Sequence, residues 1–260
     1  MAIWIDPPRW PAHGRLWSHL ISDTSYEELH EFAAAAGVPR RGFEGDHYDV
    51  PEERYAALVA AGAQPVDGHE LVRRLRASGL RFAKRKGERP LATYRNVLRP
   101  ETLPHTLHVV ASRLETPALE TSAAAVFVRD REGSILLVHS VVRDLWGAPA
   151  GGREPGETVR ECAVREVWEE SGLLLSERTL RPCGYERVVF DRRADAAYGR
   201  WGRQRSYVAV FATGLPSVRP PVAPGLADVD AAEWVTPDEA ERRCRGVFWW
   251  PLLAQSDPWG

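Results

Sequence analysis

Hydrophobic and polar positions in the first 80 residues follow a pattern that predicts a small α/β unit. Short apolar runs, at 2–5 and 64–66, alternate with amphipathic segments, as in a layered α/β fold. Each amphipathic segment opens with a capping pair, in which a glutamate follows an oxygen-bearing side chain by three residues. The pairs are Thr24 with Glu27, Asp49 with Glu52, and Asp67 with Glu70. The helices are predicted to end near Gly37, Gly62 and Gly79, because glycine suits a left-handed cap.

The pattern from about residue 119 predicts a second α/β domain. Apolar positions at 123–128 and 135–139 flank the polar turn 129–133, as in a β-hairpin. A helix that begins with Thr158 and Glu161 as a capping box follows, and Gly172 is placed to cap its end. Two further strands are predicted at 183–190 and 206–212. A C-terminal helix is predicted from Thr236 onward, with a proline at its first position.

The stretch between these two patterns is less regular. The basic run at 84–90 is typical of a solvated linker, whereas 107–111 could be a strand, either at the edge of the second domain or in an interface. We therefore expect a small α/β domain at 1–85, a linker or interface segment at 86–118, and a second domain at 119–260.

Composition narrows the class of protein. Of 260 residues, 44% are hydrophobic and 27% are charged, as in a globular protein with enough chain for two cores. The net charge of −2 argues against a nucleic-acid partner, and the sequence shows neither a membrane-spanning run nor a signal peptide. The cysteines fit no zinc spacing and are odd in number, which favours reduced thiols in the cytoplasm; they are Cys162, Cys183 and Cys244.

Three glutamates in the predicted helix after Gly151 are spaced for metal binding. Glu166, Glu169 and Glu170 lie at i, i+3 and i+4, so an α-helix places their carboxylates on one face. Like charges at this spacing destabilise a helix unless a cation neutralises them, and oxygen ligands favour Mg²⁺ or Mn²⁺. The spacing therefore predicts a divalent-metal site.

The same stretch resembles the signature of the Nudix hydrolase family. The matching positions are Gly151, Glu157, Arg165, Glu166, Val167, Glu169, Glu170, Gly172 and Leu173. The resemblance covers about residues 120–253 and implies an α/β/α sandwich with a mixed sheet. It also implies a Mg²⁺- or Mn²⁺-dependent hydrolase that cleaves the pyrophosphate of a nucleoside diphosphate linked to another group.

The resemblance implies roles for individual residues. Glu169 and Glu170 would be the main metal ligands, and Glu166 either a third ligand or the base that orients water. The Ala150 carbonyl would be a further ligand, Glu157 and Arg165 would pair to hold the glutamates, and Gly151 and Gly152 would let the backbone approach metal and phosphate. A late loop often supplies one more acid. Here the candidates are Asp228, favoured by position, and its competitors Asp230 and Glu233.

The substrate is less constrained by the sequence. Family markers for ADP-ribose and dinucleoside polyphosphates are absent, because Val188 and Phe190 stand at those offsets. Segment 191–206 is rich in arginine and aromatic residues and could cover a substrate, although a solvated hairpin is equally consistent with it. Its candidate phosphate and base contacts are Arg192, Arg193, Arg200, Arg203, Arg205, Tyr198 and Trp201. The tripeptide 149–151 gives a weak preference for an ADP-ribose-like compound or a sugar nucleotide.

The first domain resembles a small bacterial domain family of unknown function over about residues 2–80. Two short segments combine acids, histidines and an arginine with aromatic residues, and they suggest a second site that binds metal or exchanges protons. The candidates are Asp6, Arg9, His13, His19, Asp46 and His47, with Asp23 and Asp49 nearby in the sequence. Their spacing matches no metal motif, so hydrogen-bonded core residues are the alternative.

Three functions remain open at this point. The chain is a Nudix pyrophosphohydrolase, a nucleotide-sensing Nudix module without turnover, or a bifunctional enzyme with a second active site in its first domain. Intact glutamates in the signature disfavour the sensor. Homodimers are common among Nudix proteins, and the apolar tail at 247–255 could serve either an interface or the core.

Overall fold

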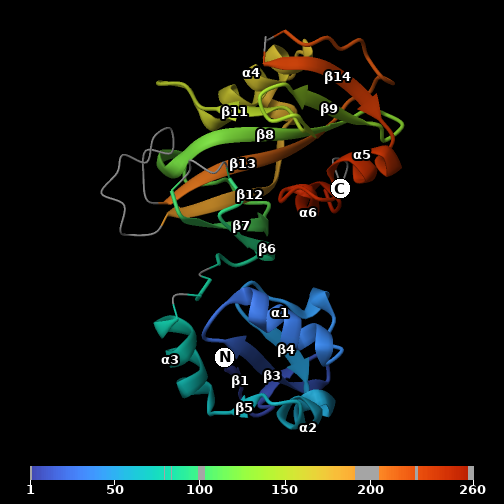
Figure 1. Cartoon of the computed structure of the whole chain (residues 1–260). Coiled ribbons are helices and arrows are strands. Elements are labelled where there is room, and N and C mark those ends of the chain that lie inside the picture. The colour runs from blue at the N-terminus through green and yellow to red at the C-terminus, as the bar shows by residue number, and fades with distance from the viewer. Residues whose placement is uncertain are drawn as a thin grey trace. The chain divides into compact units, whose positions relative to one another are not determined.

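The computed structural model describes residues 2–78, 80–82, 84–98, 103–190, 205–225 and 228–256. The chain forms two compact units, Met1–Leu91 and Ala92–Gly260 (Figure 1). Within the described ranges, no helix is both long and apolar enough to cross a membrane.

The first unit is built on a five-stranded sheet in its described part. The strands are β1 (Ile3–Ile5), β2 (Trp10–Ala12), β3 (Arg15–Ser22), β4 (Tyr48–Pro51) and β5 (Gln64–Pro65). Strand β3 pairs with β1, β2 and β4 in antiparallel fashion, and β5 runs parallel to β1. The helices are α1 (Tyr26–Ala35), α2 (Glu52–Ala60) and α3 (Gly68–Ala77). Their apolar faces join the strands in one core, which includes Ile5, Leu20, Leu29, Leu58 and Leu75.

Two of the three predicted helix starts in this unit need correction. Ser25, not Thr24, caps α1, because the Ser25 side chain accepts from the Glu28 N–H in the first turn. Asp49 does not cap α2, because it lies in β4, which continues to Pro51. The third prediction is confirmed: the Asp67 carboxylate accepts from the N–H groups of the first turn of α3.

The second unit contains a nine-stranded mixed sheet in its described part, in the order β10-β9-β8-β13-β12-β7-β6, with β11 beside β8 and β14 beside β9. Strands β8 and β13 run parallel, and β12 is antiparallel to both of its neighbours. The strands are β6 (Arg89–Arg95), β7 (His105–Ala111), β8 (Thr121–Arg129), β9 (Ile135–Ser140), β10 (Leu145–Gly147), β11 (Ala150–Gly152), β12 (Arg181–Phe190), β13 (Arg205–Gly214) and β14 (Val229–Val235). The segment 86–118, expected as a linker or interface in which 107–111 could be a strand, thus contains all of β6 and β7.

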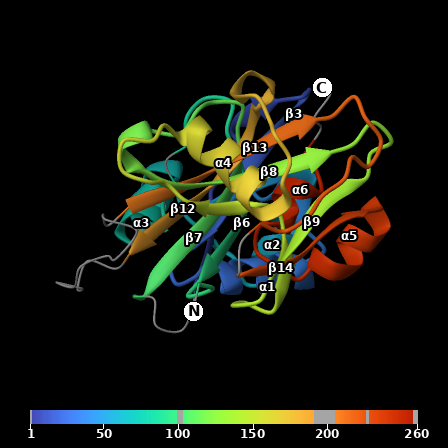
Figure 2. The same ribbon diagram turned by 90° about the horizontal axis from the view of Figure 1, so that it is seen from above.

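Helices cover both faces of this sheet. Helix α4 (Val159–Ser171) crosses β8 and β13 (Figure 2), and its Val167 packs in a core with Val126 and Phe211. On β8 the next residue, Phe127, points to the opposite face and contacts the ring of Trp249. This second face is covered by α5 (Pro237–Cys244) and α6 (Trp250–Leu253). The predicted α/β/α sandwich with a smaller α/β domain before it is confirmed.

Candidate active site

The glycine loop and α4 are fixed to each other by local hydrogen bonds. Strand β11 pairs with β8, and α4 follows with Thr158 as its N-cap. The Thr158 side chain accepts from the Glu161 N–H at 3.1 Å, and the Glu161 carboxylate accepts from the Thr158 N–H at 2.7 Å. Gly172, at φ 72°, ends the helix in the left-handed conformation. The predicted capping box and C-terminal cap are therefore confirmed, and they set the start and end of the glutamate helix.

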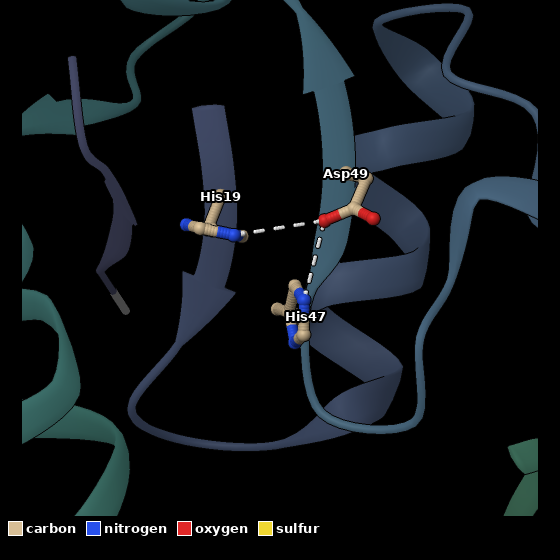
Figure 3. A group of neighbouring side chains, drawn as sticks. All are labelled: His19, His47 and Asp49. Atoms are coloured by element: carbon tan, nitrogen blue, oxygen red, sulfur yellow. Dashed lines mark ion pairs between the residues drawn. The ribbon is translucent and has the colours of Figure 1, made fainter. Parts of the chain in front are cut away.

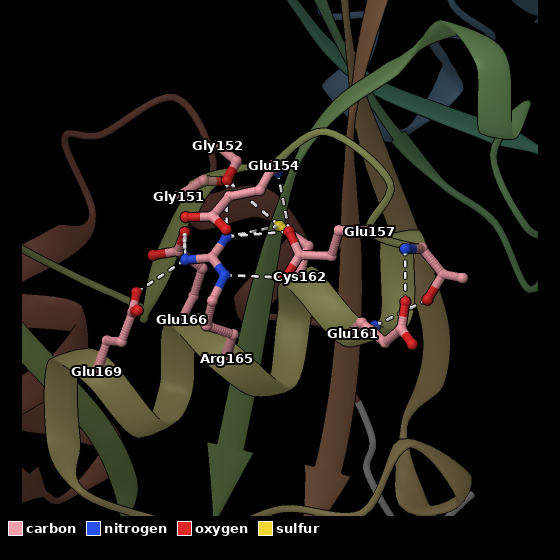
Figure 4. A network of polar contacts seen from close by, with 10 residues as sticks. Gly151, Gly152, Glu154, Glu157, Glu161, Cys162, Arg165, Glu166 and Glu169 are labelled. Atoms are coloured by element: carbon pink, nitrogen blue, oxygen red, sulfur yellow. Dashed lines mark hydrogen bonds and ion pairs between the residues drawn. The ribbon is translucent and has the colours of Figure 1, made fainter.

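Arg165 is the centre of the polar network on α4 (Figure 4). Its Nε and Nη2 donate to the two carboxylate oxygens of Glu157 at 2.8 and 3.1 Å. Its Nη1 donates to Glu166 at 2.8 Å and to Glu169 at 2.7 Å, and Nη2 also reaches the Gly152 carbonyl at 2.8 Å. The pair expected between Glu157 and Arg165 is thus present. One guanidinium joins the loop to two glutamates of the helix.

Gly151 lies directly against the Glu166 carboxylate. A Cβ atom at position 151 would fall 2.2 Å from the carboxylate atoms of Glu166, closer than any real contact. Glu166 itself is buried, and burial raises the pKa of its carboxyl above the usual value. Glycine at position 151 therefore allows a buried acid to pack against the loop backbone.

Glu170 is the second buried acid of this site. Its Oε2 accepts from the Ala150 N–H at 3.0 Å, which places it at the start of the glycine loop. Burial raises the pKa of Glu170 to about 7, and repulsion from Glu166 and Asp228 adds to the effect. A carboxylate with this pKa gains from any cation that binds beside it.

The raised pKa of Glu170 predicts how stability depends on pH and metal. In metal-free protein the folded state holds this proton more tightly than the unfolded state does, so the free energy of unfolding falls as pH rises from about 4.5 to about 7. The loss is on the order of 3 kcal/mol, at about 1.4 kcal/mol per pH unit. We expect Mg²⁺ to raise the Tm more at pH 8 than at pH 5.

Thermal melts of wild type and Glu170→Gln, with Mg²⁺ and with a chelator, test this expectation. The Gln variant should lose much of the decline with pH, and part of the Mg²⁺ shift. Burial also raises the pKa of Glu166 and that of Glu186, a buried residue of β12, and both contribute a decline in both proteins. The difference between the two proteins therefore reports Glu170. An identical pH dependence in the two proteins would contradict the assignment.

Of the three late acids, Asp228 lies near enough to α4 for its negative charge to raise the pKa of Glu170. It is exposed, it precedes β14, and its carbonyl accepts from the Val141 N–H at 2.9 Å. Its competitors have partners elsewhere: Asp230 contacts His139 at 2.7 Å, and Glu233 contacts Arg243 at 2.9 Å. This geometry is consistent with Asp228 as the additional acid, and its role stays a prediction.

The candidate substrate contacts lie mostly outside the described residues. These are Arg192, Arg193, Arg200, Arg203, Tyr198 and Trp201. Arg205 is described, and its guanidinium forms two hydrogen bonds, at 2.7 and 3.1 Å, with the Glu120 carboxylate. The fork expected to bind phosphate is therefore already engaged by an acid.

Glu186 and Arg143 were not among the residues expected from the sequence. Glu186 lies in the middle of β12 and is buried, and burial raises the pKa of its carboxyl to about 8. The charge of Arg143, in the turn after β9, acts on both Glu186 and Glu170. A glutamate within the apolar strand 183–190 is the sequence signal that could have identified this buried acid.

The oxygen donors of Glu166, Glu169 and Glu170 have the chemistry that Mg²⁺ or Mn²⁺ requires. In this structure Arg165 contacts one oxygen each of the Glu166 and Glu169 carboxylates. The Ala150 N–H bonds to Glu170, and whether the Ala150 carbonyl is a ligand stays a prediction. Among the described residues, one group of three potential ligands lies within 4.8 Å of one another, and it is in the other unit: His19, His47 and Asp49.

The acids and histidines predicted in the first domain are only partly brought together. Asp6 contacts His19, Asp46 contacts His47, and Asp49 lies beside both histidines. The other three candidates lie elsewhere: His13 is exposed in the turn between β2 and β3, Arg9 is exposed before β2, and Asp23 accepts from Trp4 Nε1.

Each of the two units matches a known protein-family profile. The family profile described as "NUDIX domain" matches residues 119–250, and the one described as "Protein of unknown function (DUF4031)" matches residues 3–78. Sandwich, glycine loop and glutamate helix agree with the first match, which covers half of the chain. The chain belongs to the Nudix family.

Two curated relatives match part of the chain. The 8-oxo-dGDP phosphatase NUDT18 of Mus musculus is 32% identical over 113 residues, which are 40% of this chain and 35% of the mouse protein. Phosphatase NudJ of Escherichia coli is 28% identical over 110 residues, which are 42% of this chain and 63% of NudJ. The chain thus spans less than two thirds of the length of either relative.

Solved structures with a similar fold include an Ap4A hydrolase binary complex from C. elegans. Its TM-score is 0.38 at 18% identity, covering 52% of this chain and 93% of that chain. Another similar structure is a bifunctional NMN adenylyltransferase/ADP ribose pyrophosphatase from Francisella tularensis, complexed with AMP and a Mn ion. Its TM-score is 0.35 at 22% identity, and the match covers 49% of this chain and 37% of that chain.

Proposed function

We propose that the chain is a divalent-metal-dependent pyrophosphohydrolase that cleaves a nucleoside diphosphate linked to another group. The observation that carries this proposal is the arrangement of the signature acids. Glu166 and Glu170 are buried against the glycine loop, and Glu169 is held beside them by Arg165. Burying like charges together destabilises a protein, and this cost is consistent with a site that a cation completes.

The residues divide the chemistry among them. Bound Mg²⁺ or Mn²⁺ would neutralise phosphate oxygens and lower the pKa of the attacking water. Glu169 and Glu170 would hold the ion, while Glu166, as ligand or base, is positioned by Gly151 and Arg165. Arg165 and Glu157 would keep the glutamates in register with the loop without touching the substrate. Asp228 is the proposed additional acid.

A panel of substrates tests the proposal. The purified 260-residue chain would be incubated with Mg²⁺ and with ADP-ribose, sugar nucleotides, NAD-type dinucleotides, nucleoside triphosphates and 8-oxo-dGDP. Products would be identified by mass spectrometry. We expect cleavage of an ADP-ribose-like compound or a sugar nucleotide at its pyrophosphate. Tight binding of one compound without turnover of any would instead support the nucleotide sensor.

Replacing Gly151 by alanine is expected to separate catalysis from folding. The added Cβ displaces the Glu166 carboxylate, so kcat should fall by about 10–100-fold, the range for loss of an orienting contact at a metal site. The clashing atoms are the end of a flexible side chain, so Tm should change little. Gly246→Ala is the control, because a Cβ there meets no atom within 4 Å. Unchanged kcat in Gly151→Ala would contradict the role given to Glu166.

A further inference from the structure

Two histidines and an aspartate converge on one face of the sheet in the first unit (Figure 3). His19 on β3 and Asp49 on β4 are direct cross-strand partners, so their side chains project from the same face. His47 immediately precedes β4, and its ring centroid lies 5.0 Å from that of His19. Nε2 of His47 lies 3.2 Å from Asp49 Oδ1, and Nε2 of His19 lies 3.8 Å from the same oxygen.

Each histidine is oriented from behind by a buried carboxylate. Asp6, just after β1, accepts from the His19 backbone N–H at 2.5 Å and from Trp10 Nε1 at 2.9 Å, and it lies 3.0 Å from His19 Nδ1. Asp46 accepts from the Phe82 N–H at 2.7 Å and lies 2.5 Å from His47 Nδ1. The side chains of both aspartates are 3% exposed. These carboxylates can only accept, so both Nδ1 atoms carry the proton and donate it.

The three potential ligand atoms face one another. Although burial lowers it, hydrogen bonds to Asp46 and Asp49 raise the pKa of His47 to about 9, so in the metal-free protein its Nε2 carries a proton and donates to Asp49 Oδ1. A divalent cation among the three atoms, which lie within 4.8 Å of one another, would take the place of that proton. A ring held through Nδ1 by a carboxylate, with Nε2 facing the other ligands, is the arrangement found in metal-ligating histidines.

We propose that His19 Nε2, His47 Nε2 and Asp49 Oδ1 bind a divalent transition metal of the Zn²⁺ type. Two ligands about 2.1 Å from a tetrahedral ion lie about 3.4 Å apart, and the distances of 3.2 and 3.8 Å bracket this value. Imidazole nitrogens favour such ions over Mg²⁺. The site is therefore chemically distinct from the all-oxygen site on α4.

The site has an open side. The side chains of His19, His47 and Asp49 are 25%, 18% and 40% exposed. Three protein ligands on Zn²⁺ leave a fourth position for water or substrate, as in catalytic rather than structural zinc sites. The metal would thus make the first unit a second reactive centre, independent of the Nudix glutamates.

Isothermal titration calorimetry of the 260-residue chain with Zn²⁺, in the presence of excess Mg²⁺, tests the proposal. Mg²⁺ occupies oxygen sites, so the remaining signal reports the histidine site. We expect one equivalent of Zn²⁺ for wild type and for the double variant Glu169→Gln/Glu170→Gln. The double variant His19→Ala/His47→Ala should lose it. Asp6→Asn, which removes the carboxylate behind His19 but none of the three proposed ligands, should weaken binding by about 10–100-fold.

Matched variants keep the result interpretable. His13→Asn removes an exposed histidine of the same unit, at φ 50°, where asparagine is tolerated, and should bind Zn²⁺ as wild type does. Asp49→Asn preserves size if the double histidine variant fails to fold, and it should also lose tight binding. Equal Zn²⁺ binding by wild type and Asp49→Asn would overturn the proposal. So would the absence of Zn²⁺ binding in the wild type.

Discussion

Glu169→Gln and Glu170→Gln are each expected to lower kcat by about 10²–10⁴-fold, the factor that corresponds to several kcal/mol of lost metal-assisted stabilisation. Glutamine preserves the size of each side chain and removes the charge that would hold the cation. Glu170 lies against the Ala150 N–H, and Glu169 is held by Arg165, so neither substitution removes an apolar contact of the core. Steady-state kinetics with the cleaved compound, over a Mg²⁺ series, measures the effect.

Glu161→Gln provides the matched control on the same helix. Glutamine also forms a capping box with Thr158, so folding and kcat should remain near wild type. A drop in kcat equal to that of Glu170→Gln would show that loss of any α4 carboxylate has the same effect, and would contradict a localised metal site.

Arg165→Lys is expected to have the next largest effect, although it keeps the positive charge. A lysine ammonium cannot reproduce the fork that contacts Glu157, Glu169 and the Gly152 carbonyl together. We expect kcat to fall by about 10–100-fold and the free energy of unfolding by about 1–3 kcal/mol. Because Arg165 acts through the glutamates, the concentration of Mg²⁺ needed for half-maximal rate should also rise.

Arg242→Lys on α5 is the control for arginine-to-lysine replacement, because Arg242 makes an exposed pair with Glu239. Its kinetics and Mg²⁺ dependence should match wild type. If Arg165→Lys lowered stability but left the Mg²⁺ dependence unchanged, the residue would be structural and would not position the ligands.

Local signals made the second unit predictable from sequence. The capping box at Thr158, the glycine cap at Gly172 and the i, i+3, i+4 glutamates all depend on residues within one helix, so spacing alone places them. The pair between Glu157 and Arg165 followed from the family resemblance. Glu186 was missed because its burial depends on neighbouring strands that are distant in sequence.

The first unit shows the opposite situation. Its predicted site residues come from segments around β1, β3 and β4, and only the antiparallel pairing of β3 with β4 brings His19 beside Asp49. Sequence spacing could not show this, and Asp49 was instead expected to cap α2. The strand considered at 107–111 is β7, whose partner β12 lies far along the chain, whereas β6 begins within the basic run that looked like a linker.

The most direct test of the central claim is hydrolysis in ¹⁸O-labelled water by wild type and by Glu170→Gln, with Mg²⁺ and the cleaved compound from the panel. The account predicts one ¹⁸O atom in a phosphate of the product, formed by wild type only when Mg²⁺ is present and nearly abolished in the variant. Cleavage at the wild-type rate in Glu170→Gln, or in the absence of any divalent ion, would contradict it.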